Sequence, residues 1–296
     1  MKTSKSDKAS IIIMYILISL FALLCLFPLL MAVSASFSSE KEIALKGFSI
    51  LPRNFTFDTY KFLLGDKLDI IVNAYGITVF VTVVGTMLSL ILTAAFAYSI
   101  SVKEFRFSNQ LAFIAYFTMI FSGGLLPWYI VLSKYYHLRD SISALILPYL
   151  MNVFNMFLVR NYYKSIPTEI FEAAKVDGAS HFRIFITIAL PLSKVGLVTV
   201  GMFCALGYWN DFQLALYFIT KDTLYPVQYL LYNMLASIQF LGSGSSSAQQ
   251  YGQHVVVPLQ TAKMAMACLS VGPIILLFPF IQKYFAKGIL VGGVKG

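Results

Sequence analysis

The sequence predicts an all-α polytopic membrane protein with about six transmembrane helices. Hydrophobic residues make up 58% of the 296 residues and charged residues only 12%, and the mean hydropathy is +0.77. A single globular core could not bury so much apolar surface. The apolar residues also gather into runs that reach the roughly 20 residues needed to cross a bilayer. Composition and run length together exclude a water-soluble domain.

The apolar runs give the order of the elements. A tail at 1–10 precedes the first transmembrane helix at 11–33, and a loop of mixed charge follows at 34–70. The main membrane core then covers 71–285, and a tail at 286–296 ends the chain. We expect five further transmembrane helices in this core, with a long loop at 220–261 before the last one. The helices are expected at about 71–101, 109–133, 141–160, 192–219 and 262–282.

Several of these helices carry residues that modify a regular helix. The second contains small residues that permit close packing with a neighbour, namely Gly85, Ser89, Ala94, Ala95, Ala97 and Ser99. In the third, Gly123-Gly124 and Pro127 predict a bend or a break. The fourth contains Pro148 together with two asparagines.

The distribution of basic residues predicts the orientation. Most of the 22 Lys and Arg residues fall on one side of the membrane if the N-terminus is inside. Basic residues in short loops mark the cytoplasmic side, so we expect both termini in the cytoplasm and the 34–70 and 220–261 loops outside. The net charge of +9 does not indicate a nucleic-acid partner, because the basic residues are scattered between apolar runs. The partner that the charge pattern indicates is a lipid bilayer.

A polar segment at 165–191, SIPTEIFEAAKVDGASHFRIFITIALP, interrupts the apolar sequence. Pro167 and Thr168 can begin a helix, and carboxylates in its first turns suit the positive end of the helix dipole. Gly178 permits a left-handed stop, and Ser180 can cap a second short helix. Leu190-Pro191 closes that second helix. By its caps alone the segment could be an ordinary cytoplasmic loop helix.

The order of residues in this segment is more specific than its caps. Glu172-Ala173-Ala174, three residues, Gly178, nine residues, Ile188, one residue and Leu190-Pro191 resembles the EAA motif of ABC importer permeases. The resemblance implies the type I importer permease fold and a coupling helix at 168–180 that docks on a cytoplasmic ATPase. The residues that it implies for this contact are Glu169, Glu172, Ala173, Ala174, Asp177 and Gly178.

The wider chain resembles the carbohydrate-uptake branch of these permeases, the maltose-type G subunits and the LplC-like polysaccharide permeases. The segments that carry this resemblance are FSGGLLPWYIV, ALILPYLMNVFNMFLVRNYYKSIPTEIFEAAKVDGAS, GYWNDF and QKYFAKGILVGGVKG. It implies a bacterial cell membrane protein that works with a second homologous permease, two ABC ATPases and an extracellular solute-binding protein. The implied cargo is an oligosaccharide or polysaccharide, and ATP and Mg would be used by the partner ATPase.

Polar residues inside the predicted helices are candidates for the substrate pathway, because each is costly in a membrane unless it faces protein or water. The candidates are Asn152, Asn155, Tyr208, Trp209, Asn210 and Asp211. Aromatic rings can stack on sugars, and amides and carboxylates can bind hydroxyl groups. Packing and hydrogen bonding between helices is the alternative role. In the 220–261 loop, the resemblance implies contacts with the binding protein at Gly242, Ser243, Gly244, Gln249, Gln250 and Tyr251.

The sequence shows no phosphate loop of the Gly-x-x-x-x-Gly-Lys-Ser/Thr type and no catalytic constellation. We therefore expect no enzymatic activity and no cofactor or metal bound by this chain. The coupling motif alone leaves open a permease for amino acids, peptides or metals. A secondary sugar transporter is a further alternative, although such folds usually show two related halves, and no such repeat is visible here. A structural membrane scaffold would leave the motif unexplained.

Overall fold

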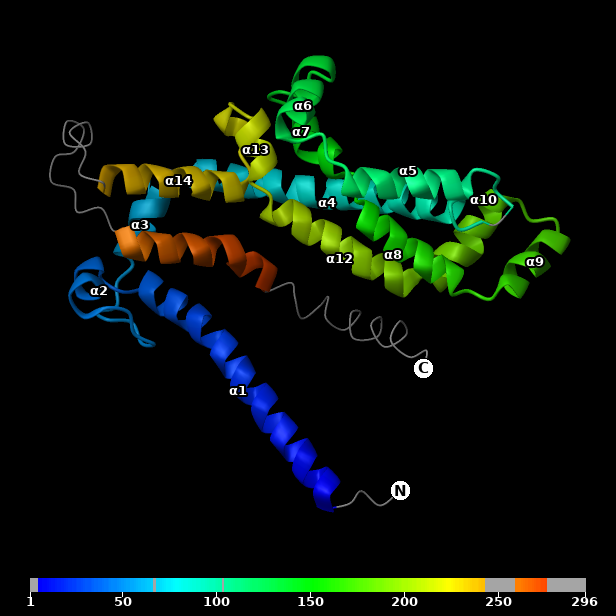
Figure 1. The fold of residues 1–296 in the computed structure, drawn as a ribbon. Helices are drawn as coiled ribbons and strands as arrows, with labels where there is room; N and C mark the ends of the chain where they lie inside the picture. The colour runs from blue at the N-terminus through cyan, green and yellow to red at the C-terminus, as the bar shows by residue number, and fades with distance from the viewer. Residues whose placement is uncertain (1–4, 66–67, 103, 243–258, 276–296) are drawn as a thin grey trace. The chain divides into compact units, whose positions relative to one another are not determined.

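The computed structural model describes residues 5–65, 68–102, 104–242 and 259–275 (Figure 1). This part of the chain is helical and contains no strand. It divides into two compact units, the first formed by Met1–Asp69 with Leu231–Pro273 and the second by Ile70–Leu230 with Ile274–Gly296. The expected all-α class is confirmed.

The first unit begins with a long apolar helix, α1 (Lys5–Ser36). Its side chains from residue 11 to residue 30 are exposed in the chain. A helix that is apolar on all sides and covered by nothing suits a lipid environment. The predicted first transmembrane helix at 11–33 lies within it.

The loop predicted at 34–70 contains two short helices, α2 (Glu40–Lys46) and α3 (Asp58–Leu64). Phe37 packs against Phe55, Phe57 and Tyr60 with ring centroids 5.6, 5.6 and 5.0 Å away. This aromatic contact holds the loop against the end of α1. Sequence composition did not indicate these helices, because the segment is short and has mixed charge.

Glu40 connects this loop to the last described helix, Leu259–Ile275. Its carboxylate accepts hydrogen bonds from the backbone N–H groups of Gln260 and Thr261, at 2.9 and 2.8 Å. A carboxylate at a helix N-terminus satisfies N–H groups that have no partner within the helix. The sixth transmembrane helix was predicted at 262–282, and its residues after 275 lie outside the described part of the chain.

The second unit is built on α4 (Leu68–Ser99), α8 (Val153–Lys164) and α12 (Lys194–Asn210). Helix α8 packs against both α12 and α5 (Ser108–Ile120), and Figure 1 shows these helices running together. The polar segment between α8 and α12 forms four short helical elements. They are α9 (Thr168–Val176), α10 (His181–Ile184), the π-helix η4 (Phe185–Ala189) and α11 (Leu190–Leu192).

The break expected in the third transmembrane helix is confirmed. Helix α5 ends at Ile120, and the chain resumes as α6 (Leu125–Ile130) and the π-helix η2 (Val131–Tyr135). The two parts meet at 113°. Gly124 has a φ of +85°, a backbone conformation that glycine adopts without a steric penalty.

The fourth and fifth transmembrane helices, predicted at 141–160 and 192–219, are also divided. The fourth consists of α7 (Ile142–Ile146), a 3₁₀ turn η3 (Leu147–Tyr149) and α8, with a bend of 50°. In the fifth, α12 ends at Asn210 and α13 (Gln213–Phe218) begins after a two-residue break. A window of hydropathy does not report such breaks, because the residues on either side are equally apolar.

The unit continues after α13 through the 3₁₀ turn η5 (Asp222–Leu224) to α14 (Val227–Gly242), which runs on past residue 230 into the first unit. In the described part of the chain, Ile11–Ser36 and Leu68–Ser99 are long and apolar enough to cross a membrane. Three bent helix pairs raise this number to five if each counts as one span.

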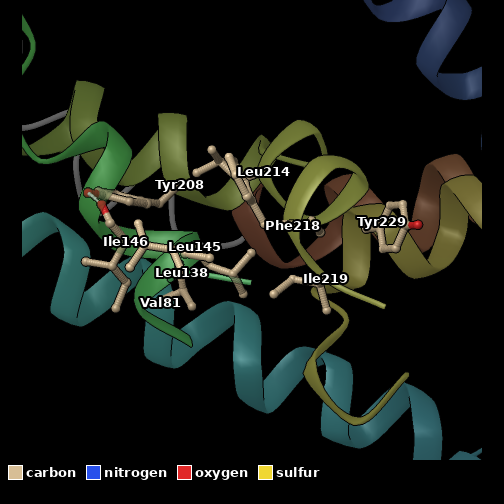
Figure 2. Packing of buried hydrophobic residues seen from close by; sticks show 11 residues of the cluster. Val81, Leu138, Leu145, Ile146, Tyr208, Leu214, Phe218, Ile219 and Tyr229 are labelled. Carbon is tan, nitrogen blue, oxygen red and sulfur yellow. Dashed lines mark hydrogen bonds between the residues drawn. The ribbon is translucent and has the colours of Figure 1, made fainter. Parts of the chain in front are cut away.

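Two clusters of buried side chains hold the second unit together. Figure 2 shows the first, in which Val81 of α4 meets residues of α7, α12 and α13. The second lies next to α9 and combines Ala97 and Ile100 with buried residues of α5, α8 and α12. The first cluster therefore contacts α12 near its end at Tyr208, and the second contacts its middle at Val200.

Helices α4 and α12 approach each other closely at Gly85. A Cβ atom at this position would lie 2.6 Å from the ring of Tyr208, which is itself buried. This contact confirms the packing role expected for Gly85. Ser89, Ala94 and Ala97 are also buried, whereas Ala95 and Ser99 are exposed and do not contribute to it.

Gly85→Ala is expected to destabilise the protein by about 1–3 kcal/mol, because the added methyl group overlaps the buried ring of Tyr208. The measurement is the thermal unfolding midpoint of the purified chain in detergent. Gly76→Ala in the same helix is the matched control, since a Cβ there meets nothing within 4 Å. Equal midpoints for both variants would contradict the close approach.

Candidate functional site

Helix α9 is short and is closed at its C-terminal end by local hydrogen bonds. Pro167 precedes it, and Asp177 ends it. Gly178 has a φ of +76°, and Ala179 N–H returns to the carbonyl of Ala174 at 2.9 Å. A left-handed glycine that closes a helix in this way satisfies its last carbonyl groups. The start and the left-handed stop expected from the sequence are confirmed, and the helix itself ends four residues before the predicted limit at 180.

The outer surface of α9 is open. None of its residues is buried, and Glu169, Glu172 and Ala173 are exposed. Val176 is 87% exposed and Ile170 is 40% exposed. These acidic and apolar side chains are uncovered in the chain and are therefore available for contact with another molecule.

Three contacts fix α9 to the rest of the second unit. Ile166, which precedes the helix, is buried in the cluster below it, and Phe171 packs against the same cluster. Lys175 donates a hydrogen bond to Glu104 at 2.6 Å. Hydrogen bonding and charge from Lys175 hold the pKa of the Glu104 carboxyl below its usual value. No sequence pattern indicates this ion pair, because 71 residues separate its partners.

The chain after α9 leads directly to α12. Ser180 accepts a hydrogen bond from Arg183 N–H at 3.3 Å, which confirms its predicted role as a cap. Ile184 and Ala189 are buried against the unit. The chain then turns by 81° at Ser193 into α12. Buried residues on both sides of α9 therefore connect it to the unit, and the turn between them at 177–183 is mostly exposed.

The breaks in the fourth and fifth helices are hydrogen-bonded to each other. Tyr208 donates to the carbonyl of Ile146 at 2.9 Å, and its hydroxyl lies 3.3 Å from that of Ser89 on α4. Figure 2 shows Tyr208 beside Ile146. Tyr149 donates to Asp211 at 3.1 Å. Two helix breaks that are distant in sequence thus form one polar cluster, which we call the break cluster (Ser89, Ile146, Tyr149, Tyr208 and Asp211).

Asp211 also caps α13. Its second carboxylate oxygen accepts a hydrogen bond from Leu214 N–H at 3.1 Å. Asn152 has the same role at α8, where it accepts from Asn155 N–H at 3.1 Å. In each case a side chain in an apolar region accepts a hydrogen bond from a backbone N–H group that has no partner within the interrupted helix.

The structure separates the six predicted pathway residues by exposure. Tyr208 and Trp209 are 4% and 5% exposed, and Asn155 is also buried. Asn152 and Asn210 are exposed, and Asp211 is half-buried. The sequence reasoning did not single out Tyr149 as a site residue, although its position between Pro148 and Asn152 marks the helix break. The pathway role of these residues stays a prediction.

The contacts predicted in the 220–261 loop fall mainly outside the described residues. Gly242 is the last residue of α14. Ser243, Gly244, Gln249, Gln250 and Tyr251 lie in the part that the structure does not describe. Their assignment to binding-protein contact stays a prediction.

Comparison with known proteins gives a family match over nearly the whole chain. Residues 1–291 match the family described as binding-protein-dependent transport system inner membrane component. The chain is 37% identical over 285 residues to the polygalacturonan/rhamnogalacturonan transport system permease protein YtcP of Bacillus subtilis (strain 168), with 96% of this chain and 97% of that protein covered. It is 38% identical over 269 residues to protein LplC of the same organism, with coverages of 91% and 89%.

A solved structure is also similar to this chain. It is the crystal structure of a bacterial ABC transporter involved in the import of the acidic polysaccharide alginate. A chain of that transporter matches with a TM-score of 0.78 and 30% sequence identity, over 96% of this chain and 99% of the other.

Removing the ion pair between α9 and Glu104 is expected to increase the mobility of α9. In Glu104→Gln, amide hydrogen exchange in residues 168–176 should become faster by up to about fivefold, because an exposed ion pair contributes at most about 1 kcal/mol. Glu104 is 62% exposed, so solvent screening keeps the effect small. In the native chain, the protection factor of these amides, which removes the pH dependence of the intrinsic exchange rate, is expected to fall in the same way as the pH drops through the lowered pKa of Glu104. Glu169→Gln, which leaves the pair intact, is the control, and equal exchange in both variants would count against the tether.

Proposed function

Since the chain belongs to the family of binding-protein-dependent transport system inner membrane components, we propose that it is the permease subunit of an ABC importer for oligosaccharides or polysaccharides. The observation that carries this proposal is α9, a capped helix with exposed acidic and apolar residues that is fixed to α12. Such a helix can receive a movement from a partner and pass it to the membrane helices.

The proposed partner of α9 is a cytoplasmic ABC ATPase, and ATP with Mg is consumed there. Glu172 would form an ion pair with a basic residue of the ATPase, and the exposed Ile170 and Val176 would supply apolar contact. The full assembly we propose holds a second related permease, two ATPases and an extracellular solute-binding protein. In this arrangement both termini and α9 lie on the cytoplasmic side of a bacterial cell membrane.

Carbohydrate cargo is supported by the relatives. The two Bacillus subtilis proteins and the alginate transporter cover nearly the whole of this chain, and two of their three descriptions specify polysaccharide transport. The saccharide taken up by this chain, whatever its length and charge, would be delivered by the solute-binding protein.

The proposed pathway passes the break cluster. Non-helical backbone at membrane depth is tolerated where it lies in protein or beside a water-filled cavity, and transporters place their sites at such breaks. Asn152 and Asn210 are exposed beside the two breaks, so their amides can reach sugar hydroxyls. Tyr208 and Asp211 would stabilise the geometry of the breaks through their hydrogen bonds to Ile146 and Leu214.

Glu172→Lys is expected to lower sugar uptake by about tenfold or more, because it places a like charge opposite the basic residue of the ATPase. The measurement combines uptake in cells with copurification of the ATPase, which should fall in parallel. Asp222→Lys makes the same charge change at an exposed residue of η5 and is the control. Normal uptake and normal copurification in Glu172→Lys would refute the coupling role.

Asn210→Ala and Tyr208→Phe are expected to separate sugar contact from packing. Asn210→Ala should raise the KM of uptake about threefold to tenfold, the value of one hydrogen bond, with an unchanged unfolding midpoint. Tyr208→Phe leaves the buried carbonyl of Ile146 without its partner, so it should lower the midpoint instead. An unchanged KM in Asn210→Ala would show that Asn210 does not contact the sugar.

A further inference from the structure

A cavity of about 530 Å³ lies between α8, α9, α10 and the segment that joins α4 to α5. Among the charged side chains of its wall, basic ones are in the majority. Four cationic side chains face two carboxylates, and the six residues are Arg106, Arg160, Lys164, Lys175, Glu104 and Glu172. Because like charges in a partly enclosed space repel each other, this wall favours a bound anion.

Two of the cations have no acidic partner. Glu104 is paired with Lys175, whereas Arg106 and Arg160 have no carboxylate within 4.0 Å among the described residues. Arg160 is half-buried, and its Nε donates to the carbonyl of Ile100 at 3.1 Å. One N–H of five is thereby used, and the guanidinium keeps the paired donors that bind a phosphate in bidentate fashion.

The same wall contains a hydroxyl group that is not satisfied. Tyr163 is 2% exposed, and its hydroxyl has no hydrogen-bond partner among the described residues. Buried polar groups in proteins are nearly always hydrogen-bonded. The cavity is therefore lined by a residue with an unmet donor, three positions after Arg160 on α8.

The edge of the cavity is aromatic and apolar. Phe105 and the neighbouring Phe107 are 38% and 53% exposed, with ring centroids 6.1 Å apart. The Arg106 guanidinium lies 5.8 Å from the centre of the Phe107 ring. These residues stand between the end of α4 and the start of α5, where the chain leaves one apolar helix and enters the next. Aromatic and basic side chains together are typical of the boundary between membrane and water.

We propose that this cavity binds the phosphate of an anionic phospholipid headgroup on the cytoplasmic side, with Arg106 and Arg160 as its principal ligands. The basic wall attracts the phosphate, and the exposed aromatic edge favours a lipid over free phosphate because it offers contact to acyl chains. The cytoplasmic placement rests on the proposed function. A lipid bound here touches α8 and α9 at once, so it holds the coupling helix in its place against the unit.

The test is lipid retention by the complete transporter, purified in nanodiscs of phosphatidylcholine with or without phosphatidylglycerol and measured by mass spectrometry. Wild-type protein should retain phosphatidylglycerol in preference to phosphatidylcholine. Arg106→Gln and Arg160→Gln should each lower that retention about fivefold, as expected for one basic side chain at a charged membrane surface. Arg106 is exposed, so its replacement leaves the buried clusters intact. Arg139→Gln, an exposed arginine outside the cavity, is the matched control.

Equal retention by wild type and both cavity variants would overturn the proposal. Inorganic phosphate that displaces the lipid and raises the unfolding midpoint equally well would assign the cavity to free anions and overturn the lipid assignment. The measurement is repeated without the ATPase, and retention seen only in its absence would assign the cavity to the ATPase instead. Lipid retention can be measured without transport. The lipid proposal and the proposed sugar uptake can therefore fail separately.

Discussion

Backbone groups in an apolar environment must be hydrogen-bonded, and this constraint governs the second unit of the chain. Continuous helices satisfy it by themselves, but three apolar segments here are bent or interrupted. At two interruptions the missing partners come from side chains within the same segments. Asp211 accepts a hydrogen bond from Leu214 N–H, and Asn152 accepts one from Asn155 N–H. The interruptions can therefore be kept in the membrane without a free backbone group at these positions.

The same constraint explains why the break cluster connects helices. An interrupted helix also leaves carbonyl groups without a partner, and Tyr208 reaches across from α12 to the carbonyl of Ile146 on α7. This reach requires α4 and α12 to be close, and Gly85 allows it because a larger residue would occupy the place of the Tyr208 ring. Hydrogen bonding at the break and close packing at the glycine thus depend on each other.

Local chemistry in the sequence predicted some of these features and not others. Gly124 and Gly178 were expected at a break and at a stop, because glycine has a conformational reason to be there that sequence displays directly, and both have positive φ. The break at Asp211 was not expected, since a carboxylate in an apolar run suits both a pathway and a cap. The pair of Lys175 with Glu104 depends on tertiary structure, and no local pattern could indicate it. The overall class, the position of α9 and its glycine stop followed from the sequence, whereas the contacts that hold α9 did not.

The rigidity of the connection between α9 and the break cluster follows from where the chain is packed. Ile166 anchors the start of α9, Ala189 anchors the π-helix after α10, and α12 spans from Ser193 to Asp211. A helix of this length covers about 25 Å at 1.5 Å per residue. Ile166 before α9 and Ile184 and Ala189 after it are buried in the same unit, so we expect a displacement of α9 to reach the packing at Ser193 and along α12. A movement delivered to α9 is thereby directed to the end of α12, where Asp211 and Tyr149 hold the two helix breaks together.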